Sequence, residues 1–230
     1  MIRENTNKLR LEWVAFKLRR RGSAKKIAGK EKEMAQVKKP KVHDAILVSA
    51  FDLFCRQGYT ATTMAEIARQ AEVNIGTLYV YFESKLAILY ALYRPWQEEK
   101  LRELAESVRK LRSPAARLRR LFIGLWGDLP AADHSFANTL MEALPTSPVT
   151  ERKQDNLLED VEGFVNDLLE EILPPERHFL LRNGLLSHLI WMAFDGYTIN
   201  SRLRDLRDIS ATADLVSDLL LGVSETPEQS

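Results

Sequence analysis

Hydroxyl-bearing side chains recur along a short stretch, residues 74–82, that also has helical spacing. Leu78 and Phe82 lie four residues apart, so on a helix they share one buried face. The other large side chains are then left mostly outside: Ile75, Thr77, Tyr79 and Tyr81. Hydroxyl groups donate and accept hydrogen bonds, which suits such a face to phosphate oxygens and to the edges of nucleic-acid bases.

Two short helices joined by a tight turn are needed to position this face. Thr63 can N-cap the first helix, because Glu66 three residues on completes a T-x-x-E capping box. Residues 71–73 supply the turn, and the side-chain oxygen of Asn74 can cap the second helix. This is the layout of a helix-turn-helix, whose second helix enters the major groove of DNA.

A longer pattern surrounds this motif. It consists of I-L-x-x-A-x-x-L-F at 46–54, G-Y at 58–59, T-T at 62–63, I-A-x-x-A at 67–71 and V-x-x-G-T-L-Y-x-Y-F-x-S-K at 73–85. With these residues the chain resembles the DNA-binding domain of the TetR family of transcriptional regulators over about fifty positions. The resemblance implies a three-helix head that binds DNA and a helical body that binds a small molecule and dimerises through two C-terminal helices.

The whole chain is predicted to be all-α, since no segment alternates with period two for long enough to form a strand. Helices are expected at 41–57, 63–71, 74–82, 84–111 with Pro95 interrupting, 114–129, 133–144, 148–173, 175–202 and 209–223. The expected domains are a basic N-terminal extension (1–37), the helix-turn-helix domain (38–94), a helical ligand-binding and dimerisation domain (95–223) and a loose tail (224–230).

Charge is distributed unevenly along the chain. Residues 1–41 carry 14 Lys/Arg against 4 Asp/Glu, a net charge of +10, so the remainder must carry −9 for the chain to reach +1. Residues 42–90 hold only three cations against five acids, which is poor in cations for a phosphate binder. The basic segment therefore has three interpretations: an arm that reaches DNA, an amphipathic helix on a membrane surface, or an extension preceding a true start at Met34.

Each residue of the helix-turn-helix has an expected role. We expect Ile75, Thr77 and Tyr81 to read base edges, and Thr63, Tyr79 and Lys85 to contact phosphate. Members of the resembled family often have lysine or arginine at the position of Ile75 and histidine at that of Tyr81. Ile75 has no hydrogen-bond donor, so it can offer only apolar contact, for example with a thymine methyl group.

The predicted body contains both a dimer surface and a ligand pocket. Apolar side chains run nearly all round residues 179–197 and recur at 215–221, which indicates a partner surface and, most simply, a homodimer. The resemblance implies an effector pocket in the body, and its candidate residues are Phe122, Trp126, Met141, Phe164, His188, Trp191 and Phe194. Each of these side chains also fits an ordinary core position.

Other functional classes have little support. The four histidines and the single cysteine, Cys55, have no metal-ligand spacing, and no cofactor motif, phosphate loop or nucleophile motif occurs. Without a disulfide framework or a long apolar run, a reducing cytoplasm is the expected compartment and stable membrane insertion is not expected. We therefore predict a dimeric transcription regulator, a repressor in preference to an activator, that binds a pseudo-palindromic operator and is released by a small-molecule effector. The alternative is a helical interaction protein that no longer binds DNA and uses its basic segment for a membrane or a protein partner.

Overall fold

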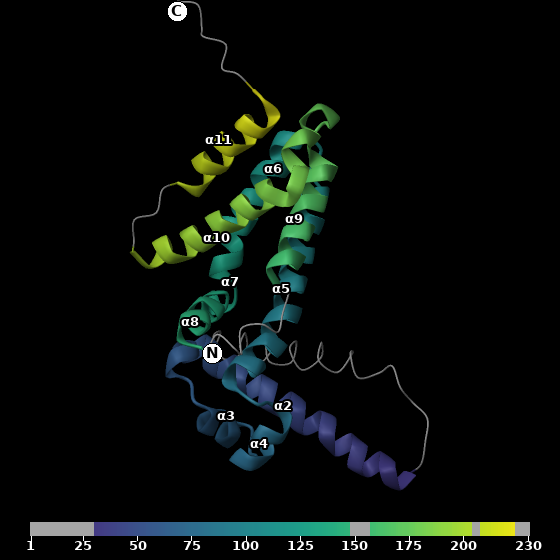
Figure 1. Cartoon of the computed structure of the whole chain (residues 1–230), viewed down its shortest axis with the longest axis vertical. Helices are drawn as coiled ribbons and strands as arrows, with labels where there is room; N and C mark the ends of the chain where they lie inside the picture. The colour runs from purple at the N-terminus through teal and green to yellow at the C-terminus, as the bar shows by residue number, and fades with distance from the viewer. Residues whose placement is uncertain (1–29, 148–156, 204–207, 224–230) are drawn as a thin grey trace, which may run out of the picture. The chain divides into compact units, whose positions relative to one another are not determined.

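The computed structural model describes residues 30–147, 157–203 and 208–223, and these residues contain helices and no strand (Figure 1). The predicted all-α class is therefore confirmed. The predicted extension lies largely outside the described residues, and the predicted tail lies wholly outside them. The helices are α2 (Lys30–Ala61), α3 (Met64–Gln70), α4 (Ile75–Tyr81), α5 (Lys85–Arg109), α6 (Pro114–Ile123), α7 (Leu129–Ser135), α8 (Asn138–Thr146), α9 (Leu157–Ile172), α10 (Leu185–Leu203) and α11 (Ile209–Leu221).

These helices form two compact units. The described part of the first unit contains α2, α3, α4, the start of α5 up to Tyr93, and most of α8. The second contains the rest of α5, α6, α7, α9, α10 and α11. Helix α8 thus packs with the N-terminal helices, although it follows them only after a long excursion of the chain.

The first unit is built around one apolar face of α2. Ile46, Ala50 and Phe54 are spaced by four residues, so they project from the same side of the helix and are fully or almost fully buried. Ile67 of α3 and Leu78 of α4 are equally buried. These two short helices each offer few apolar side chains, so packing rather than helix propensity keeps them folded.

The second unit has a core of amphipathic helices. Ser113 caps α6 with its side chain, and Pro114 occupies the first turn, where a missing N–H does no harm. The buried stripe of α9 comprises Leu157, Val161, Val165, Leu168, Leu169 and Ile172. Helix α10 contributes the buried side chains of Ile190, Trp191 and Phe194 to the core of this second unit.

Several predicted helix boundaries were wrong. Pro95 lies inside α5 without ending it. The predicted helix 114–129 passes at Gly124 into a π-helical turn, η2 (Gly124–Asp128), where a Cβ on Gly124 would lie 2.2 Å from Leu104 Cδ1. Close packing against a leucine therefore accompanies the change of helix type.

The predicted helix 175–202 is in fact two segments. Residues 175–184 form a 3-10 segment, η4 (Pro175–Gly184), and α10 begins only at Leu185. Asn183 has φ 64°, a left-handed conformation that asparagine tolerates better than most residues, and Gly184 follows with φ 67°. The break was therefore readable from an Asn-Gly pair.

Candidate nucleic-acid interface

Helices α3 and α4 are joined by the tight turn predicted at residues 71–73. The N–H of Ala71 reaches back to Ile67 O at 2.9 Å, and the N–H of Val73 reaches Ala68 O at 3.0 Å. Glu72 between them has φ 55°, which reverses the chain direction within three residues. The two helices thereby form the expected helix-turn-helix.

Thr63 begins the motif with a complete capping box. Its Oγ1 accepts the N–H of Glu66 at 3.2 Å, and Glu66 Oε2 accepts the N–H of Thr63 at 2.9 Å. The Thr63 hydroxyl also donates to Glu66 Oε2 at 2.9 Å. These hydrogen bonds from Thr63 lower the pKa of the Glu66 carboxyl below its ordinary value. Thr63 remains exposed, so capping leaves the residue available at the surface.

Asn74 caps the second helix as its residue type predicts. Its Oδ1 accepts the N–H of Thr77 at 2.7 Å, and its own backbone is extended. Gly76 in the first turn has open space around the position a Cβ would take, apart from Asn74 Oδ1 at 3.4 Å. The helix start thus offers its backbone to close approach.

The outer face of α4 is exposed and carries no charged residue. Leu78 is fully buried, whereas Ile75 is 44 % exposed and Tyr79 is 53 % exposed. Thr77 and Tyr81 are half-buried, and the Tyr81 ring lies 6.2 Å from the ring of His43. Tyr79 is therefore open to solvent, whereas Thr77 and Tyr81 are partly covered.

Val80 was missed by the sequence reasoning. It is 82 % exposed, more than any other large apolar side chain of α4. The helical angle of 100° per residue places Val80 almost opposite Leu78 and Phe82, so the signal was available. Val80 therefore joins the predicted residues on the outer face of this helix.

Lys85 has a more specific environment than expected. Its Nζ donates to Tyr59 O at 2.7 Å and to Thr62 O at 2.6 Å, and it lies 4.1 Å from the centroid of the Tyr59 ring. Burial lowers the pKa of this ammonium, while the carboxylates of Glu142 and Glu66 oppose that shift. An ammonium has three donors, so its predicted phosphate contact must use the third.

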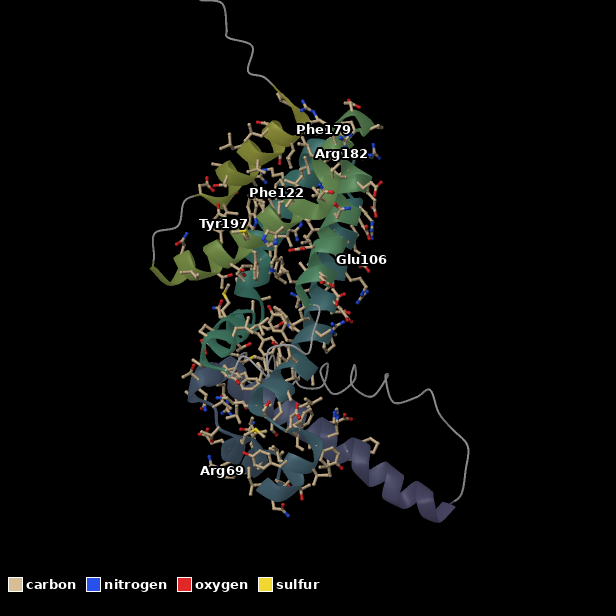
Figure 2. The ribbon with its side chains drawn as sticks, viewed as in Figure 1. Arg69, Glu106, Phe122, Phe179, Arg182 and Tyr197 are labelled. Atoms are coloured by element: carbon tan, nitrogen blue, oxygen red, sulfur yellow. The ribbon has the colours of Figure 1, made fainter. Side chains whose placement is uncertain are left out.

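Other cations of the first unit differ in how accessible they are. Arg56 is engaged by Asp52 and also donates to Gln70 Oε1 at 2.9 Å. Arg69 on α3 is exposed (Figure 2), and so is Lys41 on α2. Arg69 and Lys41 are therefore the better placed cations for phosphate contact.

Four effector candidates of the second unit, Phe122, Trp126, Trp191 and Phe194, form two aromatic groups. The Trp126 ring stacks on Phe122 at 4.7 Å and on Tyr197 at 5.5 Å, and its Nε1 donates to Ile190 O at 3.0 Å. Tyr197 was not among the predicted residues. Trp191 and Phe194 stack with centroids 4.2 Å apart.

The remaining effector candidates lie elsewhere. Phe164 on α9 is half-buried. His188 is exposed, with Nδ1 2.6 Å from Glu162 Oε1. Met141 lies on α8 in the first unit. Phe122, Trp126, Trp191 and Phe194 are thus the predicted residues that are both aromatic and buried.

One side of α10 carries several exposed large apolar side chains. We define the α10 stripe as the exposed large side chains at spacings of four, three and seven residues, namely Leu185, Leu189, Met192 and Ile199. These spacings hold the stripe on one side of the helix. Helix α11 adds Leu215 and Leu219, which are also exposed.

The described residues show neither a metal-binding cluster nor a single membrane-spanning helix. No group of three or more His, Cys, Asp and Glu side chains there could hold a metal ion. By length and hydropathy, no single described helix could cross a membrane. Helices α4 and α5 pass that test only together, as a pair bent by 53°.

Comparison with known proteins identifies the motif. Residues 46–92 match the family model described as bacterial regulatory proteins, tetR family. An uncharacterized HTH-type transcriptional regulator, YuxN of Bacillus subtilis (strain 168), is 25% identical over 189 residues, which cover 78% of this chain and 63% of that protein. The fatty acid metabolism regulator protein of the same organism is 29% identical over 136 residues, covering 59% of this chain and 68% of that protein. The match thus spans slightly less than two thirds of the first of these relatives.

Solved structures agree in fold. The fatty acid degradation regulator FadR from Bacillus halodurans has a TM-score of 0.59 at 23% identity, over 80% of this chain and 96% of that one. Thermus thermophilus FadR, a TetR family transcriptional repressor in complex with lauroyl-CoA, has a TM-score of 0.56 at 22% identity, over 82% of this chain and 99% of that one. At these identities the likeness establishes the fold alone.

Proposed function

We propose that this protein is a cytoplasmic repressor released from its operator by a small molecule. The premise is that the chain belongs to the TetR family of transcriptional regulators rather than to a class of enzymes. The observation that carries the proposal is the exposed outer face of α4 behind its Asn74 cap. A short helix with two tyrosines, a threonine and an isoleucine on its outer side indicates a surface that binds a partner. The major groove of duplex DNA is that partner.

In this proposal the residues of the motif divide between two tasks. Ile75, Thr77 and Tyr81 meet base edges, while Thr63 and Tyr79 meet phosphate from the flanks. Lys85 adds one phosphate contact from the start of α5. Ile75 recognises by apolar contact, which favours a thymine methyl group over a hydrogen-bonding base edge.

The functional form is proposed to be a homodimer. The α10 stripe and the exposed leucines of α11 support this, because uncovered apolar faces of this extent are rare on monomers. A two-fold dimer presents two copies of α4, so the operator is pseudo-palindromic with half-sites about one helical turn apart.

The proposed effector is a fatty acyl thioester of coenzyme A. Two solved relatives are described as complexes with stearoyl-CoA and lauroyl-CoA, and one curated relative is named a fatty acid metabolism regulator. The buried aromatic groups around Trp126 and Trp191 are apolar, which is the chemistry that the lining of an acyl-chain pocket requires. The effector must bind the DNA-free conformation more tightly, or it shifts nothing.

The test is selection of duplexes from a random pool by the purified full chain, followed by titration with lauroyl-CoA. Enrichment of a pseudo-palindrome that lauroyl-CoA releases supports the proposal. The cation-poor head favours a second candidate, a helical interaction protein that does not bind DNA. Failure to enrich any sequence at low salt would favour that candidate.

A further inference from the structure

Residues 58–62 link the long helix α2 to Thr63, where the helix-turn-helix begins. Gly58 has φ 79° and ψ 172°, which breaks the helical path. The residues after it start a new turn, and the first N–H groups of a new turn need an acceptor from outside it. Glycine has no side chain that could cap them.

Glu142 of α8 supplies that acceptor from 83 positions further along the chain. Its Oε2 accepts the N–H of Tyr59 at 2.9 Å and that of Thr60 at 3.4 Å. A carboxylate is the favoured partner at the N-terminal end of a helical turn. The fit is close, since a Cβ on Gly58 would lie 2.8 Å from the same oxygen.

An opposite charge holds the other side of the same turn. Lys85 donates to the carbonyls of Tyr59 and Thr62, and its ammonium and the Glu142 carboxylate attract each other. The Thr62 hydroxyl closes the turn by donating to Gly58 O at 2.7 Å. Thus one carboxylate from α8 and one ammonium from α5 clamp the turn that leads into Thr63.

We propose that Glu142 is a positioning residue for DNA binding, which fixes the turn 58–62 and thereby sets Thr63 and α3 for the duplex. This inference rests on the proposed function, because it concerns how the same surface is held. Helix α8 follows α7 in the chain, and α7 belongs to the second unit, where the effector is proposed to bind. Glu142 thus lies on the first helix of the chain after the segment 94–138 of the second unit.

The clamp and simple electrostatics predict opposite changes in DNA affinity for the substitution Glu142→Ala. Deleting a negative charge from a protein ordinarily strengthens its binding to DNA. Glu142→Ala instead should weaken binding by about tenfold, because an unclamped turn leaves a smaller fraction of the protein competent to bind. Glu142→Gln keeps an acceptor oxygen and should lose less. The matched control is Glu159→Gln, which removes the same charge from an exposed position of α9 and should leave affinity equal or slightly higher.

Two measurements on the full chain test the proposal. The first is fluorescence anisotropy on a duplex selected by the wild-type protein, at one salt concentration and below the unfolding temperature of every variant. The second is amide hydrogen exchange without DNA, in which Tyr59 and Thr60 should exchange faster in Glu142→Ala and at the wild-type rate in Glu159→Gln.

Wild-type affinity in Glu142→Ala would overturn the proposal, and so would weakened affinity with unchanged exchange at Tyr59 and Thr60. These outcomes leave the proposed function intact, since the wild-type protein still binds its duplex. If the wild-type protein selects no duplex, the proposed function fails. In that case, unchanged amide hydrogen exchange at Tyr59 and Thr60 in Glu142→Ala would also refute the proposal that Glu142 holds the turn 58–62.

Discussion

Replacing Leu189 with glutamate should convert the dimer into monomers. Leu189 is 65 % exposed on α10 in the single chain, at the centre of the α10 stripe. Burying a whole leucine side chain contributes about 1.5–3 kcal/mol, so burying two thirds of one contributes about 1–2 kcal/mol. A two-fold interface contains the residue twice, which gives about 2–4 kcal/mol per dimer.

That range corresponds to a dimer dissociation constant raised about 30- to 700-fold, at 1.4 kcal/mol for each factor of ten. Glutamate adds two carboxylates that the interface would have to desolvate, so the estimate is a lower bound. Sedimentation velocity over a dilution series measures the constant directly. The same variant should lose affinity for a two-half-site operator, because each head then binds alone.

The matched control is Leu158→Glu. Leu158 is 46 % exposed on α9 and lies outside the α10 stripe, so this change should leave the dimer intact. A Leu189→Glu protein that remains dimeric at the wild-type concentration would refute the stripe as the interface. A wild-type protein that sediments as a monomer at every concentration would refute the dimer itself.

Four further substitutions test the other parts of the account. Tyr79→Ala should weaken binding to every duplex by a similar factor of about ten, whereas Ile75→Ala should chiefly reduce the preference for the selected sequence; competition binding with point-mutated duplexes would expose exchanged roles. Thr63→Ala should remove about 1 kcal/mol of stability through the lost cap, measured by urea unfolding followed by circular dichroism, and an unchanged midpoint would contradict the capping box. Burial raises the pKa of Asp195, so the folded state binds its proton more tightly and stability falls as the pH rises through that pKa. Asp195→Asn should therefore raise the melting temperature at neutral pH by about 1–2 °C and give less gain in acid, below the ordinary pKa of aspartate; an equal gain at both pH values would argue against burial as the cause.

Local sequence signals predicted the helix-turn-helix well because the interactions that define it join residues close together in the sequence. The capping box of Thr63 and Glu66 and the cap at Asn74 each involve residues three positions apart, and all their hydrogen bonds are present. The spacing of Leu78 and Phe82 likewise predicted which side of α4 is buried. The exposure of Val80 followed from the same geometry but was overlooked.

Tertiary contacts explain what the sequence could not predict. No pattern connects Glu142 to Tyr59, because their contact depends on where α8 packs. The inward direction of the Lys85 ammonium depends on the carbonyls that the Gly58 turn presents to it. Tyr197 was overlooked as a partner of Trp126 for the same reason, since stacking partners on different helices are set by packing.

The most direct test of the central claim is the affinity of the full chain for its selected duplex as a function of salt concentration. Lys41, Arg69 and Lys85 of each head would give about six phosphate contacts in a dimer, and so a slope of log affinity on log salt near −5. The account predicts that slope or a steeper one, with weaker binding of an unselected duplex at each salt concentration. Absence of binding at low salt, or equal affinity for selected and unselected duplexes, would contradict it.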